Sequence, residues 1–229
     1  MEKKQLLEQL ANAIVEGDGK KAVDTARAIL EAGIDPLEAI QQGATKGLDE
    51  IGRRFQNCEA FLPELILSGD AMKACTDVIK PHIRSEQKDQ MISGKVVIGS
   101  AFGDIHDIGK NIVATILGGS GFDIYDMGIN VAVKQFVAKA EEVQANVIAM
   151  SSLLTSTSHY QRLLIEHLKD AGLRQKYYVV IGGAPVTPEW AVKIGADGYA
   201  RTAAGATELL KKIIQGPPPP LTKTLVVNN

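Results

Sequence analysis

A change of pattern at Lys95 divides this chain into two parts that must fold differently. Before Lys95 the apolar residues recur at helical spacing, and no segment reads convincingly as a strand. After it, short β-branched runs alternate with segments of helical length. Such alternation is typical of right-handed βαβ units and of a parallel sheet with helices on both faces. The sequence therefore predicts a helical domain followed by an α/β domain.

The first part is predicted to form a four-helix bundle. Asp35, Pro36 and Glu38 together indicate a helix start, because they supply an N-cap, a proline in the first turn and an early acid. Helices that each carry one apolar stripe and are joined by short loops pack as an antiparallel bundle. The predicted helices span residues 2–16, 18–32, 35–55 and 62–82.

The second part is predicted to be a flavodoxin-like, doubly wound parallel sheet of five strands. The strand order of such a sheet reverses between the first and third strands, so the loops beginning at Phe102 and Ser151 should face each other. Four consecutive prolines then end the last helix, and we expect the tail to follow the surface or enter solvent. The expected divisions are a helical domain (1–84), a linker (85–94), an α/β domain (95–216) and a proline-rich tail (217–229).

Composition excludes several classes of function. The chain has 25 basic and 27 acidic residues, and a net charge of −2 does not favour nucleic acid or a membrane surface as a partner. No apolar run approaches the ~20 residues that cross a bilayer, and the first residues do not resemble a signal peptide, so we expect a cytoplasmic protein. Cys58 and Cys75 lack the spacing of a structural zinc site and are too few for a disulfide framework.

The loop after the first predicted strand reads DIHDIG and holds Asp104, His106 and Asp107. The glycines near it fit neither the dinucleotide-binding fingerprint nor a P-loop. One histidine and two acids are a poor ligand set for a bare metal ion. A metal already held by a macrocycle needs only one axial ligand, and Asp104 would then fix the histidine tautomer. A solvated turn is the alternative that these six residues leave open.

Together with this loop, three further segments extend the pattern into a family resemblance. The run from Asp104 to Gly109 resembles the DxHxxG signature of cobalamin-binding domains. Residues 151–155 match SxLxT, residues 182–183 match a glycine pair, and both occur in the order of that family. The stretch from Phe55 through FLPEL resembles the helical cap of methionine synthase and of corrinoid methyl carriers. The resemblance covers about residues 1–215.

The resemblance implies a role for each matching position. His106 is the expected lower axial ligand of cobalt, Asp104 accepts its hydrogen bond, and Thr157, which is serine in methionine synthase, completes a relay. Phe55 and Leu62 are expected to shield the upper face, although Cys58 replaces the glycine that is usual in this cap. The expected corrinoid-binding residues of the α/β domain are Asp104, His106, Asp107, Ile108, Gly109, Ser151, Leu153, Thr155, Gly182 and Gly183.

The resemblance also implies a function. A chain of 229 residues with this content has no room for a catalytic barrel of ~250 residues, so we expect a carrier, a non-autonomous corrinoid subunit of a methyltransferase system. It would carry a methyl group on cobalt from a substrate:corrinoid methyltransferase to a corrinoid:tetrahydrofolate or corrinoid:thiol methyltransferase. A reductive activating protein is a third expected partner. The alternatives are a cobalamin sensor, a storage module and a mutase subunit.

Overall fold

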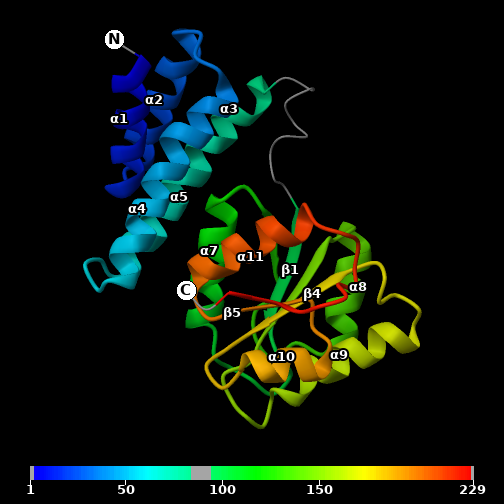
Figure 1. Ribbon diagram of the computed structural model, residues 1–229. Coiled ribbons are helices and arrows are strands. Elements are labelled where there is room, and N and C mark those ends of the chain that lie inside the picture. The colour runs from blue at the N-terminus through cyan, green and yellow to red at the C-terminus, as the bar shows by residue number, and fades with distance from the viewer. Residues whose placement is uncertain (1–2, 84–93, 228–229) are drawn as a thin grey trace. The chain divides into compact units, whose positions relative to one another are not determined.

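The computed structural model describes residues 3–83 and 94–227. These residues divide into two compact units, a helical unit and an α/β unit, and each is described by itself (Figure 1). Of the predicted linker, only Gly94 lies within the described residues. No helix in the described part of the chain is both long and apolar enough to cross a membrane.

The helical unit contains the four predicted helical segments. The N-cap prediction is confirmed, since the Asp35 side chain accepts a hydrogen bond from Glu38 N at 3.0 Å. The segment that follows is helical throughout, but a π-helical stretch interrupts its α-type hydrogen bonding. The elements are α1 (Lys3–Val15), α2 (Gly19–Glu31), α3 (Pro36–Glu38), η1 (Ala39–Ala44), α4 (Thr45–Gln56), α5 (Leu62–Ile79) and η2 (Lys80–His82).

The helical unit has its own apolar core. The residues that recur at helical spacing in the sequence are the ones that the bundle buries, as expected for helices with one apolar stripe. The largest fully buried side chains of this unit are Leu10, Ile14, Ile29, Leu65, Met72 and Ile79.

The α/β unit is built on one parallel sheet with strand order β2-β1-β3-β4-β5-β6. The first five positions have the predicted flavodoxin-like order. The strands are β1 (Lys95–Ser100), β2 (Asp123–Asp126), β3 (Val147–Ser151), β4 (Tyr178–Gly182), β5 (Gly198–Ala200) and β6 (Leu225–Val227). The helices are α7 (Ile108–Gly119), α8 (Val133–Val143), α9 (His159–Asp170), α10 (Pro188–Ile194) and α11 (Ala203–Ile214).

Helices cover both faces of this sheet, as the alternating pattern predicts (Figure 1). On one face, α8, α9 and α10 pack around buried residues that include Phe136 and Leu164. On the other face, α7 and α11 pack around residues that include Leu117 and Leu209. Because the strands are covered on both sides, their sequences are nearly continuous apolar runs rather than alternating ones.

The sheet has six strands among the described residues, so the prediction of five was wrong. The sixth, β6, lies in the tail that we expected to follow the surface or enter solvent, and it pairs with β5 in parallel. Two hydrogen bonds fix the approach to β6. Leu221 N donates to the Asp197 carboxylate at 2.7 Å, and Thr224 Oγ1 donates to Ala196 O at 2.7 Å. The tail is therefore part of the sheet.

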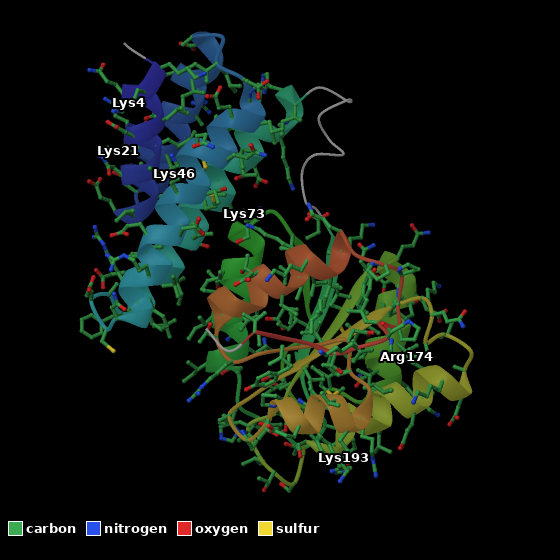
Figure 2. All side chains as sticks on the ribbon, in the orientation of Figure 1. Lys4, Lys21, Lys46, Lys73, Arg174 and Lys193 are labelled. Carbon is green, nitrogen blue, oxygen red and sulfur yellow. The ribbon has the colours of Figure 1, made fainter. Side chains whose placement is uncertain are left out.

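A buried ion pair supports this attachment. Arg174, labelled in Figure 2, lies 2.8 Å from the Asp197 carboxylate, and both side chains are almost fully buried. The same carboxylate accepts a hydrogen bond from Val179 N at 2.6 Å. Buried charges need such partners. The Asp197 carboxylate therefore contacts the start of β4, the tail and Arg174 together.

Candidate functional site

The loops after β1 and β3 meet at the carboxyl edge of the sheet, where the strand order reverses. β1 has β2 on one side and β3 on the other, so the connections from β1 and β3 leave toward opposite faces. Leu153 N, in the second loop, donates to the carboxylate of Asp104 in the first loop at 2.7 Å. The predicted approach of the two loops is therefore confirmed.

Asp104 is fully buried at the centre of this contact. Its Oδ1 accepts from His106 N at 3.1 Å and is 2.8 Å from His106 Nδ1. Its Oδ2 accepts from Leu153 N, from Leu154 N at 3.2 Å and from Thr157 Oγ1 at 2.8 Å. A buried carboxylate is tolerated only when its oxygens are bonded in this way, and here both oxygens are bonded.

These contacts determine the charge of Asp104. Burial raises the pKa of the carboxyl, but the hydrogen bonds from His106, Leu153 and Thr157 outweigh it and lower the pKa from 3.8 to about 2. Asp104 is therefore a carboxylate at neutral pH and has no proton to donate. The proton shared with His106 must then lie on Nδ1, so Nε2 is the ring nitrogen without a hydrogen in the neutral tautomer that this contact selects. The His106 side chain is 44% exposed, so Nε2 belongs to a ring that solvent or a ligand reaches.

Two buried hydroxyl groups lie behind Asp104. Thr157, which we expected here, is joined by Ser152, and their hydroxyl oxygens are 2.8 Å apart. Each of the two is also 3.0 Å from the main-chain oxygen of Leu154. Ser152 was missed from sequence because it is one of several hydroxyl residues in this loop, and the pattern does not show which of them point inward.

Exposed apolar side chains lie on the loops that follow β1, β2 and β3 and at the start of α7, and His106 lies on the first of these loops. Apolar side chains gathered at one edge indicate a surface that binds an apolar ligand. Ile108 and Leu153 were predicted as binding residues, whereas the other four were not. The exposed fractions are 45% for Phe102, 70% for Ile105, 66% for Ile108, 43% for Ile129, 42% for Leu153 and 39% for Leu154.

The predicted residues on β3 and β4 also lie at this edge. Ser151 is half-buried and is opposite Gly182 in the register of the sheet. Gly183 has φ of 126°, and a Cβ there would be 1.7 Å from Ser152 O, so the chain's own backbone uses the room that this glycine leaves. Thr155 is exposed in the loop after β3, and its main-chain oxygen accepts a hydrogen bond from Ser158 Oγ at 2.9 Å.

The remaining predicted residues of the first loop lie at the start of α7. Asp107 precedes the helix, and its main-chain oxygen accepts a hydrogen bond from Asn111 N at 2.7 Å. A Cβ at Gly109 would meet no atom within 4 Å, so this position opens onto free space. The next residue, Lys110, is buried and pairs with Asp126 at the end of β2 at 2.6 Å. This ion pair holds the start of α7 against the sheet.

The residues of the predicted cap lie in the helical unit. Phe55 is half-buried near the end of α4, and Leu62 is half-buried at the first position of α5. Cys58, which replaces the usual glycine, has φ of 59°. The backbone thus adopts the left-handed conformation that glycine favours, even though a cysteine occupies the position. Phe61, beside Leu62, is 72% exposed.

The donor set of the α/β unit fits a metal that arrives inside a macrocycle. In the described residues, no group of three or more histidine, cysteine or acidic side chains is placed to hold a bare metal ion. One imidazole is accessible, its Nδ1 is bonded to a carboxylate, and exposed apolar side chains lie on its own loop and on the loop after β3. A metal-ligating imidazole usually bonds its other ring nitrogen to a carboxylate in this way.

Comparison with known proteins gives the same cofactor. Two family models, both described as B12 binding domain, match residues 94–208 and residues 6–80. Trimethylamine corrinoid protein 1 of Methanosarcina acetivorans is 40% identical over 93% of this chain and 98% of that relative. Dimethylamine corrinoid protein 1 of the same organism is 42% identical over 93% of this chain and 100% of that relative.

Solved structures agree in fold. A chain of the methanol:cobalamin methyltransferase complex from Methanosarcina barkeri superposes with a TM-score of 0.77 and is 27% identical. The match covers 95% of this chain and 82% of that chain. The similarity therefore extends over both the helical segment and the α/β segment of the sequence.

Proposed function

The chain belongs to the family of corrinoid proteins with B12 binding domains, and we propose that it carries a methyl group on cobalt between two methyltransferases. The single observation that carries the proposal is the pairing of Asp104 with His106. A buried carboxylate keeps the proton on Nδ1 and so presents Nε2 as a metal ligand. When bound, the corrinoid supplies a cobalt atom that accepts and releases the methyl group.

We propose that the α/β unit holds the corrinoid from its lower face. His106 would supply a nitrogen ligand to the cobalt atom, Asp104 orients the His106 ring, and Thr157 donates to the other oxygen of Asp104. Ser151 and Thr155 line the path of the nucleotide tail, and Gly109 and Gly182 leave room beside it. Gly183 acts indirectly, because it lets Ser152 approach the end of β4. Asp107, Ile108 and Leu153 complete the contact surface.

We propose that the helical unit protects the upper face of the bound corrinoid. Phe55 and Leu62 are apolar residues at the end of α4 and the start of α5, and neither is fully buried within the helical unit. An apolar cover excludes water from a reactive cobalt centre.

The proposed partners are two methyltransferases and a reductive activating protein. One methyltransferase is specific for the methylated substrate, and the other passes the methyl group to tetrahydrofolate or to a thiol. Methylated amines are the first substrates to test, because the relatives above are named for trimethylamine and dimethylamine. Methanol is the next, because the superposed chain comes from a methanol:cobalamin methyltransferase complex.

Replacing the histidine tests the ligand assignment. We expect His106→Ala to bind cobalamin but to lose protein-nitrogen superhyperfine splitting from the electron paramagnetic resonance spectrum of the Co(II) form. His159→Ala is the matched control, because His159 is exposed at the start of α9 and its Nδ1 contacts Ser156 O at 2.7 Å. An H106A spectrum that still shows splitting from a protein nitrogen would contradict the assignment.

A second experiment tests the carrier function itself. The protein, reconstituted with cobalamin and reduced, is mixed with candidate methyltransferases and with methylamines or methanol. We expect the corrinoid absorption spectrum to change on methylation and to revert when an acceptor enzyme with a thiol or tetrahydrofolate is added. A sensor or a storage module would bind the corrinoid and show neither change with any partner.

A further inference from the structure

Ser100, the last residue of β1, makes a hydrogen bond to the proposed site that has no role among the contacts of Asp104 and Thr157. Its side chain is fully buried, and its Oγ donates to the main-chain oxygen of His106 at 2.7 Å. A buried hydroxyl needs a partner, since leaving it unbonded costs free energy. Here the partner is the main chain of the proposed cobalt ligand, six residues further along the chain.

The main chain of Ser100 is itself fixed to the sheet. Its N–H donates to Gly128 O at 2.9 Å, and its carbonyl accepts from Val131 N at 3.0 Å. Across the sheet it lies in register with Ser151 of β3. The hydroxyl of Ser100 is therefore attached to a rigid strand end, and a group bonded to it is held at a fixed place relative to the sheet.

His106 is held at three of its hydrogen-bonding groups. Its main-chain N–H and its Nδ1 both bond to Asp104 Oδ1, at 3.1 and 2.8 Å, and its main-chain oxygen bonds to Ser100. Nε2 is the hydrogen-bonding group that these contacts leave for a ligand. Asp104 sets the direction of the ring, whereas Ser100 sets the position of the main chain from which the ring projects.

We propose that Ser100 is a positioning residue that fixes how far the His106 imidazole projects from the sheet edge. This inference rests on the proposed function, because it assumes that His106 ligates cobalt. A metal–nitrogen bond requires the ligand atom to be placed within a few tenths of an ångström. A histidine on a loop reaches that accuracy only if both its ring and its main chain are held.

The test compares Ser100→Ala and Ser100→Thr with the wild type, each reconstituted with cobalamin in the Co(II) form. The pH is set where the wild type contains equal amounts of the histidine-ligated and unligated forms by electron paramagnetic resonance. Loss of one buried hydrogen bond should lower the ratio of ligated to unligated form about fivefold in S100A. S100T keeps the hydroxyl and should return the ratio to the wild-type value.

Ser158→Ala is the matched control, because Ser158 Oγ donates to a main-chain oxygen within the other loop of the site. It should leave the ratio unchanged. Far-UV circular dichroism of the apo-protein checks that each variant folds. If S100A does not fold, Ser100→Cys replaces it, since a thiol is close in size to a hydroxyl but is a weak donor. The expected loss in S100C is the same as in S100A.

The outcomes separate the inference from the proposed function. If the wild type shows no histidine nitrogen at any pH, the ligand assignment fails and the inference fails with it. If the wild type and H106A behave as expected while folded S100A matches the wild type, only the role of Ser100 is overturned. A folded S100T with a ratio as low as that of S100A would also overturn it.

Discussion

At the scale of single residues, the site depends on one buried charge. Asp104 accepts hydrogen bonds from His106 in its own loop and from Leu153 and Thr157 in the loop after β3. Its carboxylate therefore links residues that are about fifty positions apart in the chain. Desolvation of a carboxylate costs several kcal/mol, and these donors offset that cost. The same bonds that orient the histidine therefore also stabilise the fold around it.

This dual role predicts a pH-dependent effect of Asp104→Asn in the apo-protein. The folded-state pKa is lowered to about 2, so the carboxylate stabilises the protein above its unfolded pKa and this stabilisation is lost as the pH falls toward 2. The wild type should be more stable than D104N by about 2 kcal/mol at pH 6, from a shift of nearly two pKa units. Urea unfolding at pH 6, 4, 3 and 2.5 measures the difference.

Asp107→Asn is the control for that comparison, because it removes an exposed carboxylate from the same loop. Its difference from the wild type should be small throughout the series. The D104N difference should shrink below pH 4, where the unfolded chain begins to take up the proton. A difference that stayed constant down to pH 2.5 would show that the charge of Asp104 is not the source of the stability.

Gly109 and Gly183 should respond differently to alanine. A Cβ at Gly183 would lie 1.7 Å from Ser152 O at a φ of 126°, so Gly183→Ala should destabilise the apo-protein by about 2–3 kcal/mol or more. A Cβ at Gly109 meets nothing within 4 Å. Gly109→Ala should leave the stability within about 1 kcal/mol and weaken cobalamin binding about tenfold, or 1.4 kcal/mol. Thermal unfolding and equilibrium binding of cobalamin measure the two effects.

At the scale of elements, the sequence predicted the features that are determined by residues close together in the chain. The helix starting near Asp35 depends on a cap and on apolar spacing, and it begins within a few residues of its predicted place. The π-helical stretch η1 was missed, because nothing in its sequence AIQQGA distinguishes π-helical from α-helical hydrogen bonding. Ser100 and Ser152 were missed because a serine in the sequence does not show which way its hydroxyl points.

The strand β6 was missed for a different reason. It has three residues, too few to show a period, and four prolines precede it. What makes it a strand is its partner β5 together with the Asp197 carboxylate, which accepts the Leu221 N–H. Those determinants lie more than twenty residues away in the chain, so no local pattern contains them.

The position of β6 predicts that the tail contributes to stability. Ending the chain after Gly216 removes β6 and the donor from Leu221, and it leaves one oxygen of a buried carboxylate without that bond. We expect a loss of about 1.5–3 kcal/mol, the range for hydrogen bonds to charged groups. Thermal unfolding of the α/β unit followed by tryptophan fluorescence measures it.

Val226→Ala in the full chain is the control for the truncation, because Val226 is exposed on β6 and its side chain should matter little. The truncated protein should unfold at a lower temperature than both the wild type and V226A. An unchanged unfolding midpoint would mean that the tail pairs with the edge of the sheet without stabilising the α/β unit.

At the scale of the whole molecule, the chain contains two units with separate cores, and a single tryptophan distinguishes them. Trp190 is the only tryptophan of the sequence and lies on α10, where its indole donates to the buried Gln161 at 3.1 Å. Its fluorescence therefore reports the α/β unit. Far-UV circular dichroism reports the helices of both units, so the two signals need not change together when the protein unfolds.

Core substitutions should separate the two signals. Leu10 and Leu164 are both fully buried, the first in the helical unit and the second between α9 and the sheet. Leu-to-Ala changes at such sites cost about 2–5 kcal/mol. Leu10→Ala should lower the midpoint of the dichroism change and leave the tryptophan midpoint in place, whereas Leu164→Ala should lower the tryptophan midpoint. Cobalamin should raise the tryptophan midpoint of Leu10→Ala, since the proposed lower ligand lies in the α/β unit. Equal shifts of both signals in both variants would instead mean that the two cores unfold as one cooperative unit.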